Sequence, residues 1–255
     1  MFIKDGTRLY VNITNVCDVT CPFCCMYSGN KNDSFMDFDT FKSIVDECEG
    51  DIELQLEGGE PTQHRLLMLF VQYAVSKPNM KKIILLTNGI STIDPSNRAY
   101  GTMLKHLVLI ARENKHIEFE VKISINSYII NSIIANNKWM SSDRVFSSYN
   151  YTIFSTEDIS NFNIRFNVRL DKSDYDEIIK DMILKYEIAK YCDVYYLQSY
   201  GRLSGNEKYD DIVIKQNIAN WRVYACTGKC FDQDLKARSE YELSIGAYTP
   251  SKMDD

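Results

Sequence analysis

The chain has 255 residues, of which 45% are hydrophobic and 12% aromatic, enough for one globular domain or one domain with a small appendage. A net charge of −6 and a pI near 5.2 argue against nucleic acid as the main partner, because phosphate binding needs a basic surface. No signal peptide and no membrane-spanning apolar stretch is found, so the eight cysteines predict a cytoplasmic protein with metal chemistry and without disulfides.

Polar and apolar residues alternate over residues 8–14, which predicts the first strand. Directly after it, Cys17, Cys21 and Cys24 stand at C-x3-C-x2-C spacing. Three thiolates so close together can hold an iron–sulfur cluster and leave one iron without a protein ligand, because a cubane normally takes four. Clustered cysteines also bind zinc, usually as two separated pairs, or fill a core, and the spacing alone leaves these alternatives open.

The second predicted strand, residues 52–57, ends in Gly58, Gly59, Glu60 and Pro61. Glycines at a strand end let the backbone approach a ligand closely, because no Cβ intervenes. A simple strand-to-loop turn would use the same residues. Between the two strands, residues 39–49 have helical spacing, and Cys48 on their apolar face is assigned to the core.

The rest of the chain continues to alternate between strands and helices. Further strands are predicted at residues 81–89, 117–126, 162–170 and 194–198. Further helices are predicted at residues 65–76, 96–114, 128–139 and 173–191. The aromatic stretch 147–154 and the sequence YELSI, residues 241–245, are each interpreted as a possible extra strand. This order predicts an α/β fold with a parallel sheet and right-handed crossovers.

The cysteine spacing, Phe23 before the third cysteine and the GGEP sequence together resemble the radical S-adenosylmethionine (radical SAM) superfamily. The resemblance implies a partial (β/α)6 parallel barrel over residues 1–200 and a small C-terminal extension, residues 201–255, that caps it. It also implies a [4Fe-4S] cluster held by Cys17, Cys21 and Cys24. S-adenosyl-L-methionine would bind beside the cluster, with GGEP holding the amino group of its methionyl part.

In a parallel barrel the ligand binds at the carboxyl ends of the strands. This rule and the resemblance add five candidate cofactor-binding residues: Asn88, Ser124, Asn126, Arg144 and Asn167. Asn126 stands where relatives often carry aspartate, and Arg144 resembles an arginine that pairs with the cofactor carboxylate in some relatives. Exposure without function is the alternative for Ser124, Asn126 and Arg144. His64, just after GGEP, is expected to be a surface loop residue.

The C-terminal part resembles the SPASM and twitch branch of the superfamily, but lacks its full auxiliary cysteine set. Residues 200–206, YGRLSGN, resemble a GR turn of these relatives. Cys192, Cys226 and Cys230 could in principle bind an auxiliary cluster. Cys192, however, precedes the sixth strand and so lies at the end opposite the active-site rim, and two thiolates are too few for a stable cubane. A single cluster is therefore predicted.

The resemblance implies an enzyme that reductively cleaves S-adenosylmethionine to a 5′-deoxyadenosyl radical, which takes hydrogen from a peptide or small molecule. An external donor such as flavodoxin or ferredoxin would supply the electron. A glycyl-radical-enzyme activase and a deazapurine-forming synthase are alternatives, and a zinc-binding module is the non-enzyme alternative. Because 16 residues precede Cys17, recognition of a peptide would have to come from outside that segment. Gly59→Val is expected to weaken cofactor binding while leaving the iron content intact.

Overall fold

The structure, a computed structural model, describes residues 6–90, 98–137, 139–199, 201–209, 221–232 and 234–245. The chain forms two compact units. The first unit comprises Met1–Lys81 and Gln198–Asp255, and the second comprises Lys82–Leu197. None of the described helices combines the length and apolar character needed to cross a membrane.

The first unit contains three parallel strands, with β1 (Thr7–Thr14) between the other two. Its amino-terminal part continues with α1 (Phe38–Asp46), β2 (Ile52–Gly58), the 3-10 helix η1 (Pro61–Gln63) and α2 (Leu67–Val75). Its carboxyl-terminal part contains the 3-10 helices η3 (Gly201–Leu203) and η4 (Glu207–Tyr209), then β7 (Trp221–Tyr224) and α8 (Leu235–Ser244). The predicted extension therefore contributes a strand, β7, that the sequence did not predict.

Strict alternation along β1 and β2 gives the sheet of this unit two different faces. Leu9, Val11 and Ile13 are fully buried on one face, and helices α1 and α2 pack together through the Phe41 and Phe70 rings, whose centroids lie 4.3 Å apart. Polar side chains fill the other face, and parallel pairing sets them opposite one another in register: Arg8 beside Glu53, Tyr10 beside Gln55, and Asn12 beside Glu57. We call this the polar face of the first unit.

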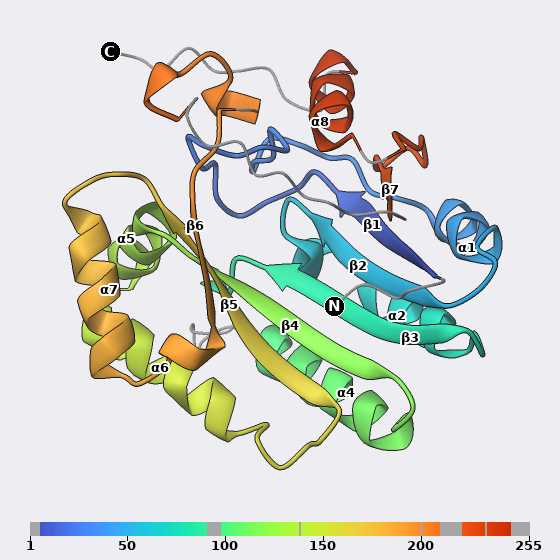
Figure 1. Ribbon diagram of the computed structural model, residues 1–255, viewed down its shortest axis with the longest axis horizontal. Helices are drawn as coiled ribbons and strands as arrows, with labels where there is room; N and C mark the ends of the chain where they lie inside the picture. Colours follow the sequence, from blue (N-terminus) through green and yellow to red (C-terminus); the bar gives the residue numbers. More distant parts are fainter. Residues whose placement is uncertain are drawn as a thin grey trace. The chain divides into compact units, whose positions relative to one another are not determined.

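The second unit contains four parallel strands in the order β3, β4, β5 and β6. Its elements in chain order are β3 (Met80–Thr87), α4 (Arg98–Glu113), β4 (Glu118–Ile125), α5 (Ser127–Asn136), α6 (Ser142–Phe154), β5 (Phe162–Leu170), α7 (Tyr175–Lys185), the 3-10 helix η2 (Ala189–Tyr191) and β6 (Cys192–Tyr196). Helices α5, α6 and α7 contact one another and lie side by side (Figure 1).

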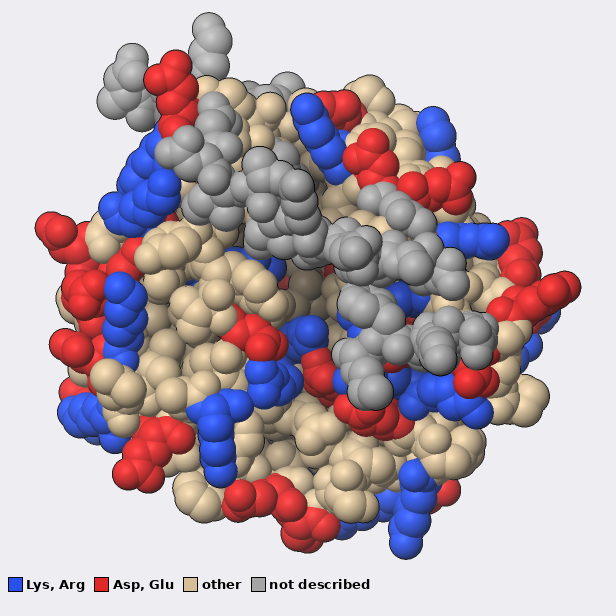
Figure 2. Space-filling view, viewed as in Figure 1, with Lys and Arg blue, Asp and Glu red and all other residues tan. Residues whose placement is uncertain are grey.

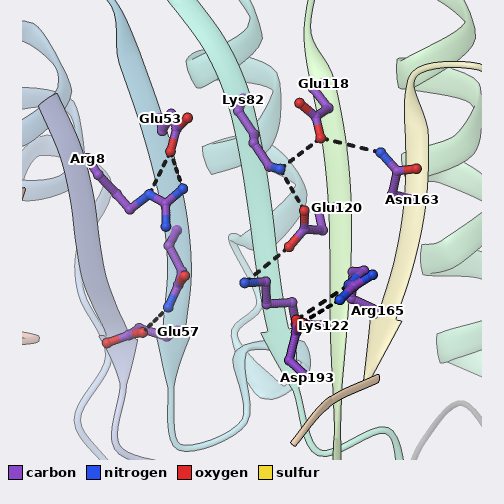
Figure 3. Close-up of polar contacts among 11 residues, drawn as sticks. Arg8, Glu53, Glu57, Lys82, Glu118, Glu120, Lys122, Asn163, Arg165 and Asp193 are labelled. Carbon is purple, nitrogen blue, oxygen red and sulfur yellow. Dashed lines mark hydrogen bonds and ion pairs between the residues drawn. The ribbon is translucent and has the colours of Figure 1, made fainter. Parts of the chain in front are cut away.

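The sheet of the second unit also has a polar face, and Figure 3 shows its side chains forming a ladder of ion pairs across neighbouring strands. The Lys82 Nζ atom lies 2.7 Å from a Glu118 oxygen and 2.6 Å from a Glu120 oxygen. Glu120 also pairs with Lys122, at 3.2 Å. Arg165 on β5 pairs with Asp193 on β6. The charges on this face therefore neutralise one another locally.

Parallel strands alternating with helices make this an open α/β fold, consistent with the predicted partial barrel. The six predicted strands are all present, displaced by at most about two residues, the usual uncertainty of element ends. Acidic and basic side chains are interspersed over the face shown in Figure 2, so that face gives no support for phosphate-backbone binding.

Three predictions of secondary structure are wrong. The aromatic stretch 147–154 is not a strand but the end of helix α6, where Val145, Phe146, Tyr149 and Ile153 form a buried helical stripe. YELSI is part of helix α8. The predicted helix at 173–191 stops at Lys185, because Glu187 adopts a left-handed φ of 55°, and a separate 3-10 turn follows.

Candidate functional site

The three cysteines of the C-x3-C-x2-C sequence lie on one loop that follows β1 in the first unit. Backbone hydrogen bonds fold this loop back on itself: the Cys17 N–H donates to the Gly29 carbonyl at 3.2 Å, and the Cys24 N–H donates to the Cys21 carbonyl at 3.2 Å. The Ser28 N–H donates to the Cys24 sulfur at 3.4 Å. Cys17 is buried, while Cys21 and Cys24 are half-buried.

The electrostatic environment of these thiols is unusual for free cysteines. Burial, followed by the nearby Glu60 carboxylate, raises the pKa of the Cys17 thiol well above its usual range. Burial, followed by Cys24, likewise raises the pKa of Cys21, although Arg202 counteracts part of this shift. Bare thiolates are thus disfavoured here. A bound metal cluster would reverse the balance, because its positive charge stabilises the thiolates that ligate it.

The donor set fits an iron–sulfur cluster better than a single metal ion. Within the part of the chain that the structure describes, no three Cys, His, Asp or Glu side chains converge closely enough to hold one ion. A cubane does not require such convergence, because its ligands bind separate iron atoms at different corners. Three thiols on one loop supply the soft ligands that such a cluster takes.

Gly58 and Gly59 lie directly against the segment that leads into the cysteine loop. The Gly59 N–H donates to the Thr14 carbonyl at 2.6 Å, and a Cβ on Gly59 would lie 2.2 Å from the Val16 carbonyl oxygen. A Cβ on Gly58 would lie 2.3 Å from the Thr14 carbonyl oxygen. Such contacts are impossible, so both glycines are required by chain packing. We therefore expect Gly59→Val to lower the iron content as well as cofactor binding, since valine would displace Val16, the residue before Cys17.

Glu60 is fully buried, and its backbone N–H donates to the Val16 carbonyl at 2.8 Å. Its carboxylate caps η1 by accepting the Thr62 N–H at 3.1 Å, and Pro61 is the first residue of that helix. Phe23 is half-buried in the cysteine loop. The structure thus brings four predicted cofactor-binding residues, Gly58 to Pro61, into contact with or close to the loop that carries the predicted metal ligands.

His64 is not the surface residue that the sequence predicts. Its side chain is buried, with Nε2 2.9 Å from the Met36 carbonyl oxygen and Nδ1 accepting the Leu66 N–H at 3.0 Å. Burial lowers its pKa, and the Met36 carbonyl opposes part of that shift. Both ring nitrogens are occupied by structural contacts, so His64 connects the segment after GGEP to the segment before α1.

The GR turn at Gly201 and Arg202 holds the cysteine loop from its other side. The Arg202 guanidinium donates to the Cys21 carbonyl at 2.5 Å and to the Ser28 carbonyl at 2.7 Å, and its backbone N–H donates to the Cys24 carbonyl at 3.2 Å. Gly201 has a φ of +66°, and a Cβ there would lie 2.3 Å from the Cys25 Cα atom. The sequence resemblance marked this turn, but its role in bracing the loop was missed.

Helix α8 is the second feature that the sequence did not reveal. The buried Arg238 guanidinium donates to a Glu57 oxygen at 2.6 Å on the polar face of the first unit. Ser239 donates from its hydroxyl to the Cys25 carbonyl. The buried Glu242 carboxylate accepts the side-chain N–H of Asn12. No apolar stripe marks this helix in the sequence, since its buried residues are polar.

The other predicted cofactor-binding residues belong to the second unit. Asn88 follows β3 and is buried, with its side-chain oxygen accepting the Ile90 N–H at 2.9 Å. Ser124 on β4 and Asn167 on β5 are register partners near the carboxyl ends of their strands, on the polar face. Asn126 caps α5, because its side-chain oxygen accepts the Ile129 N–H at 2.8 Å. Three neighbouring strands thus present polar side chains at one edge, as predicted.

Arg144 has different surroundings from those strand-end residues. It lies exposed in the first turn of α6, and its guanidinium carbon is 5.8 Å from the centre of the Trp139 ring. This contact gives the side chain a local partner. Its role toward a cofactor stays a prediction.

The cysteines outside the loop have separate surroundings. Cys192 begins β6 in the second unit, at the amino end of the strand, as predicted. In the first unit the Cys226 thiol is buried and donates to the Ile13 carbonyl at 3.6 Å, whereas Cys230 is exposed. Cys48 is half-buried on α1's carboxyl side, with its thiol donating to the Ile44 carbonyl at 3.5 Å.

Comparison with known proteins connects this chain to the radical SAM superfamily. It is 31% identical over 95 residues to a GTP 3′,8-cyclase from Vibrio parahaemolyticus, covering 34% of this chain and 28% of the cyclase. It is 28% identical over 176 residues to an uncharacterised protein, MJ0907, from Methanocaldococcus jannaschii, covering 63% and 56% of the two chains. GTP 3′,8-cyclases are radical SAM enzymes, so the chain has homologues in that superfamily. It spans about half or less of the length of these relatives.

No protein-family model matches the chain. Among solved structures, SuiB from Streptococcus suis bound to its precursor peptide SuiA aligns with 79% of this chain and 41% of SuiB, with 16% identity and a TM-score of 0.46. The enzyme anSMEcpe, with bound AdoMet and the Cp18Cys peptide, aligns with 84% of this chain and 54% of its own, with 16% identity and a TM-score of 0.47. At these TM-scores the similarity decides nothing about the present chain.

Proposed function

We propose that this chain is a radical SAM enzyme, with Cys17, Cys21 and Cys24 as ligands of a [4Fe-4S] cluster. The observation that carries the proposal is the bracing of the cysteine loop from two sides. Gly58, Gly59 and Glu60 contact the residues before Cys17, and Arg202 binds the carbonyl groups of Cys21, Cys24 and Ser28. The loop that carries the three thiols is thus held mainly through its backbone. Homology to GTP 3′,8-cyclases supports the assignment.

The bound cluster would supply the electron that cleaves S-adenosylmethionine reductively. This cleavage would give a 5′-deoxyadenosyl radical, which would take hydrogen from the substrate. The chain's own residues then have three tasks. The cysteine loop holds the metal, the GGEP backbone receives the methionyl amino group, and Arg202 keeps the loop in its folded conformation. The strand-end residues Asn88, Ser124 and Asn167 of the second unit are proposed as further cofactor-binding residues. Arg144 and Asn126 are proposed with them on the resemblance alone.

The substrate is a peptide or a small molecule, and the electron comes from an external donor such as flavodoxin or ferredoxin. One cluster per chain is proposed, because Cys192 belongs to the amino end of β6 and Cys226 and Cys230 differ in burial. Iron analysis of a reconstituted triple variant lacking Cys17, Cys21 and Cys24 tests this point. About four irons remaining per chain would establish an auxiliary cluster, and none would support a single site.

The main test replaces Cys17, Cys21 or Cys24 singly by alanine in protein reconstituted without oxygen. Each variant should lose the cluster absorbance and the formation of 5′-deoxyadenosine from S-adenosylmethionine. Cys25→Ala is the matched control, because Cys25 is adjacent to Cys24 but lies outside the C-x3-C-x2-C spacing. It should keep both the iron and the cleavage. Cleavage by any of the three other variants would refute the assignment.

A further inference from the structure

Buried polar atoms without a hydrogen-bond partner gather where helix α8 meets the polar face of the first unit. Within the described residues, five such atoms belong to four side chains here: Asn12 Oδ1, Asn15 Nδ2, Arg238 Nε and Nη1, and Glu242 Oε2. All four residues are at most 2% exposed. Burying a polar atom without a partner costs about 1–3 kcal/mol, so this many together indicate a missing partner.

The four side chains form one connected group. The Asn12 side-chain N–H group donates to the Asn15 side-chain oxygen at 2.7 Å and also to Glu242 Oε1. Arg238 and Glu242 lie four residues apart on α8, on the same side of the helix. The side chains that carry the unpartnered atoms are therefore neighbours. They are also of both kinds, since Asn15 and Arg238 offer donors whereas Asn12 and Glu242 offer acceptors.

The charges of the group favour a ligand that carries an ammonium. Two carboxylates, Glu57 and Glu242, share the single guanidinium of Arg238. Burial raises the pKa of Glu242 to about 7, with Glu57 adding to the shift and Arg238, Asn12 and the Cys226 backbone opposing it. An ammonium would supply the missing charge, and a carboxylate or carbonyl oxygen on the same molecule would accept from Arg238 and Asn15.

The position of the group connects it to the proposed reaction. Arg238 Nη2 lies 3.1 Å from the Met26 sulfur, and Ser239 binds the Cys25 carbonyl, so α8 reaches the end of the cysteine loop. The resemblance assigns the methionyl group of S-adenosylmethionine to GGEP. The α8 group adjoins GGEP, because Asn12 Oδ1 lies only 2.6 Å from where a Cβ on Gly58 would be. Its occupant would therefore lie beside the methionyl group, where the other reactant is expected.

We propose that Asn12, Asn15, Arg238 and Glu242 form a binding site for an α-amino-acid head group, a primary ammonium beside a carboxylate or carbonyl, carried by the substrate. This inference rests on the proposed function for the identity of the occupant. The substrate class is accordingly an amino acid or the amino-terminal residue of a peptide. Helix α8 of the C-terminal extension supplies the two charged residues of the site.

The test titrates L-alanine into the reconstituted enzyme, saturated with S-adenosylmethionine, by calorimetry up to about 50 mM, a range that detects millimolar affinity. Wild-type enzyme should bind L-alanine saturably, and ethylammonium or propionate, which each lack one charged group, at least about tenfold more weakly. Glu242→Gln should weaken L-alanine binding by at least about tenfold. Glu240→Gln, an exposed carboxylate on the same helix, is the matched control and should bind like wild type.

Three results would overturn the site: no saturable binding of L-alanine, equal binding by the Glu242→Gln variant, or only ordered water on these atoms in a crystal soaked with L-alanine. If S-adenosylmethionine competes with L-alanine and Glu242→Gln weakens both equally, the site belongs to the cofactor and the substrate assignment fails. Failure of the proposed function would look different, because the wild-type chain would then hold no iron. The triple cysteine variant should still bind L-alanine.

Discussion

The polar faces of the two sheets differ in what covers them. In the second unit the charged side chains on β3 to β6 pair with one another along the sheet, and many keep partial contact with solvent (Figure 3). In the first unit Arg8 pairs with Glu53 in the same way, but the far end of the polar face, at Asn12 and Glu57, is buried against Arg238 and Glu242 of α8. The same alternating sequence pattern thus produces paired charges in both units, and a buried group with unpartnered polar atoms only where α8 covers the face.

Strand alternation therefore determines which residues share a face of a sheet, but not which element covers that face. Arg165 and Asp193 keep side-chain exposures of 31% and 28%, so water screens their attraction. The Arg238 and Glu57 side chains are only 2% and 9% exposed, so neither charge has an alternative partner in solvent. Equivalent substitutions in the two units should therefore have very different costs.

The largest effect is expected from Arg238→Ala. It would leave Glu57 and Glu242 buried without their shared cation, and such a loss costs about 4 kcal/mol. Urea unfolding followed by circular dichroism measures the free energy of unfolding. A loss below about 1 kcal/mol would mean that solvent reaches these carboxylates and that the contrast between the two faces is not real.

Gly201→Ala should have the next largest effect and lower the free energy of unfolding by about 3 kcal/mol. A left-handed φ of +66° is unfavourable for alanine, and the new Cβ would overlap the Cys25 backbone. Iron content after reconstitution should fall with it. Gly205→Ala is the matched control, because Gly205 also has a left-handed φ, +78°, but a Cβ there meets no atom within 4 Å. It should cost only about 1 kcal/mol and keep the iron. Equal iron loss in both variants would remove the argument for a braced loop.

Glu242→Gln should change how stability depends on pH. The carboxyl has a raised pKa of about 7 in the folded chain against 4.5 when unfolded, caused by burial and opposed by Arg238 and Asn12, with Glu57 adding repulsion. The stability that this carboxyl contributes to the folded chain is therefore fully present below about pH 4.5 and is lost as pH rises through about 7. Between pH 5 and 8 the wild type should lose on the order of 2 kcal/mol relative to the variant, measured by urea unfolding. If the free energies of unfolding of the wild type and the variant changed in parallel between pH 5 and 8, Glu242 would not titrate in this range.

The smallest effect is expected from Arg165→Ala on the polar face of the second unit. Its partner Asp193 can turn to water, so the cost should stay below about 1 kcal/mol and shrink further in high salt. Unfolding in low and high salt measures both effects. A cost comparable to that of Arg238→Ala would show that the second polar face is as tightly buried as the first.

Much of the fold could be predicted from the sequence, because strand alternation and the buried runs are local patterns. Helix α6 was mistaken for a strand because its aromatic residues favour strands, while Ser141, which caps it, carries a weaker signal. The sequence does not predict helix α8, for a different reason. Its buried side is formed by Arg238, Ser239 and Glu242, so a search for apolar periodicity finds nothing.

The parts of the candidate site that are short sequence motifs could likewise be predicted. Cysteine spacing and GGEP are short sequences, and the structure places them next to each other. The bracing contacts are not local: Arg202 binds Cys21 across 181 positions, and Ser239 binds Cys25 across 214. No pattern within a sequence window reports such a pair. Only the fold makes these residues neighbours.

The pairing of β7 with β1 sets an order for assembly on the ribosome. The cysteine loop is synthesised well before Arg202 and Ser239, which fix its carbonyl groups and follow it by more than 170 residues. During translation the thiols of this loop therefore lack their final framework. A cluster inserted before residue 239 emerges would meet a loop still free to move, so maturation of the metal site is expected to follow synthesis of α8.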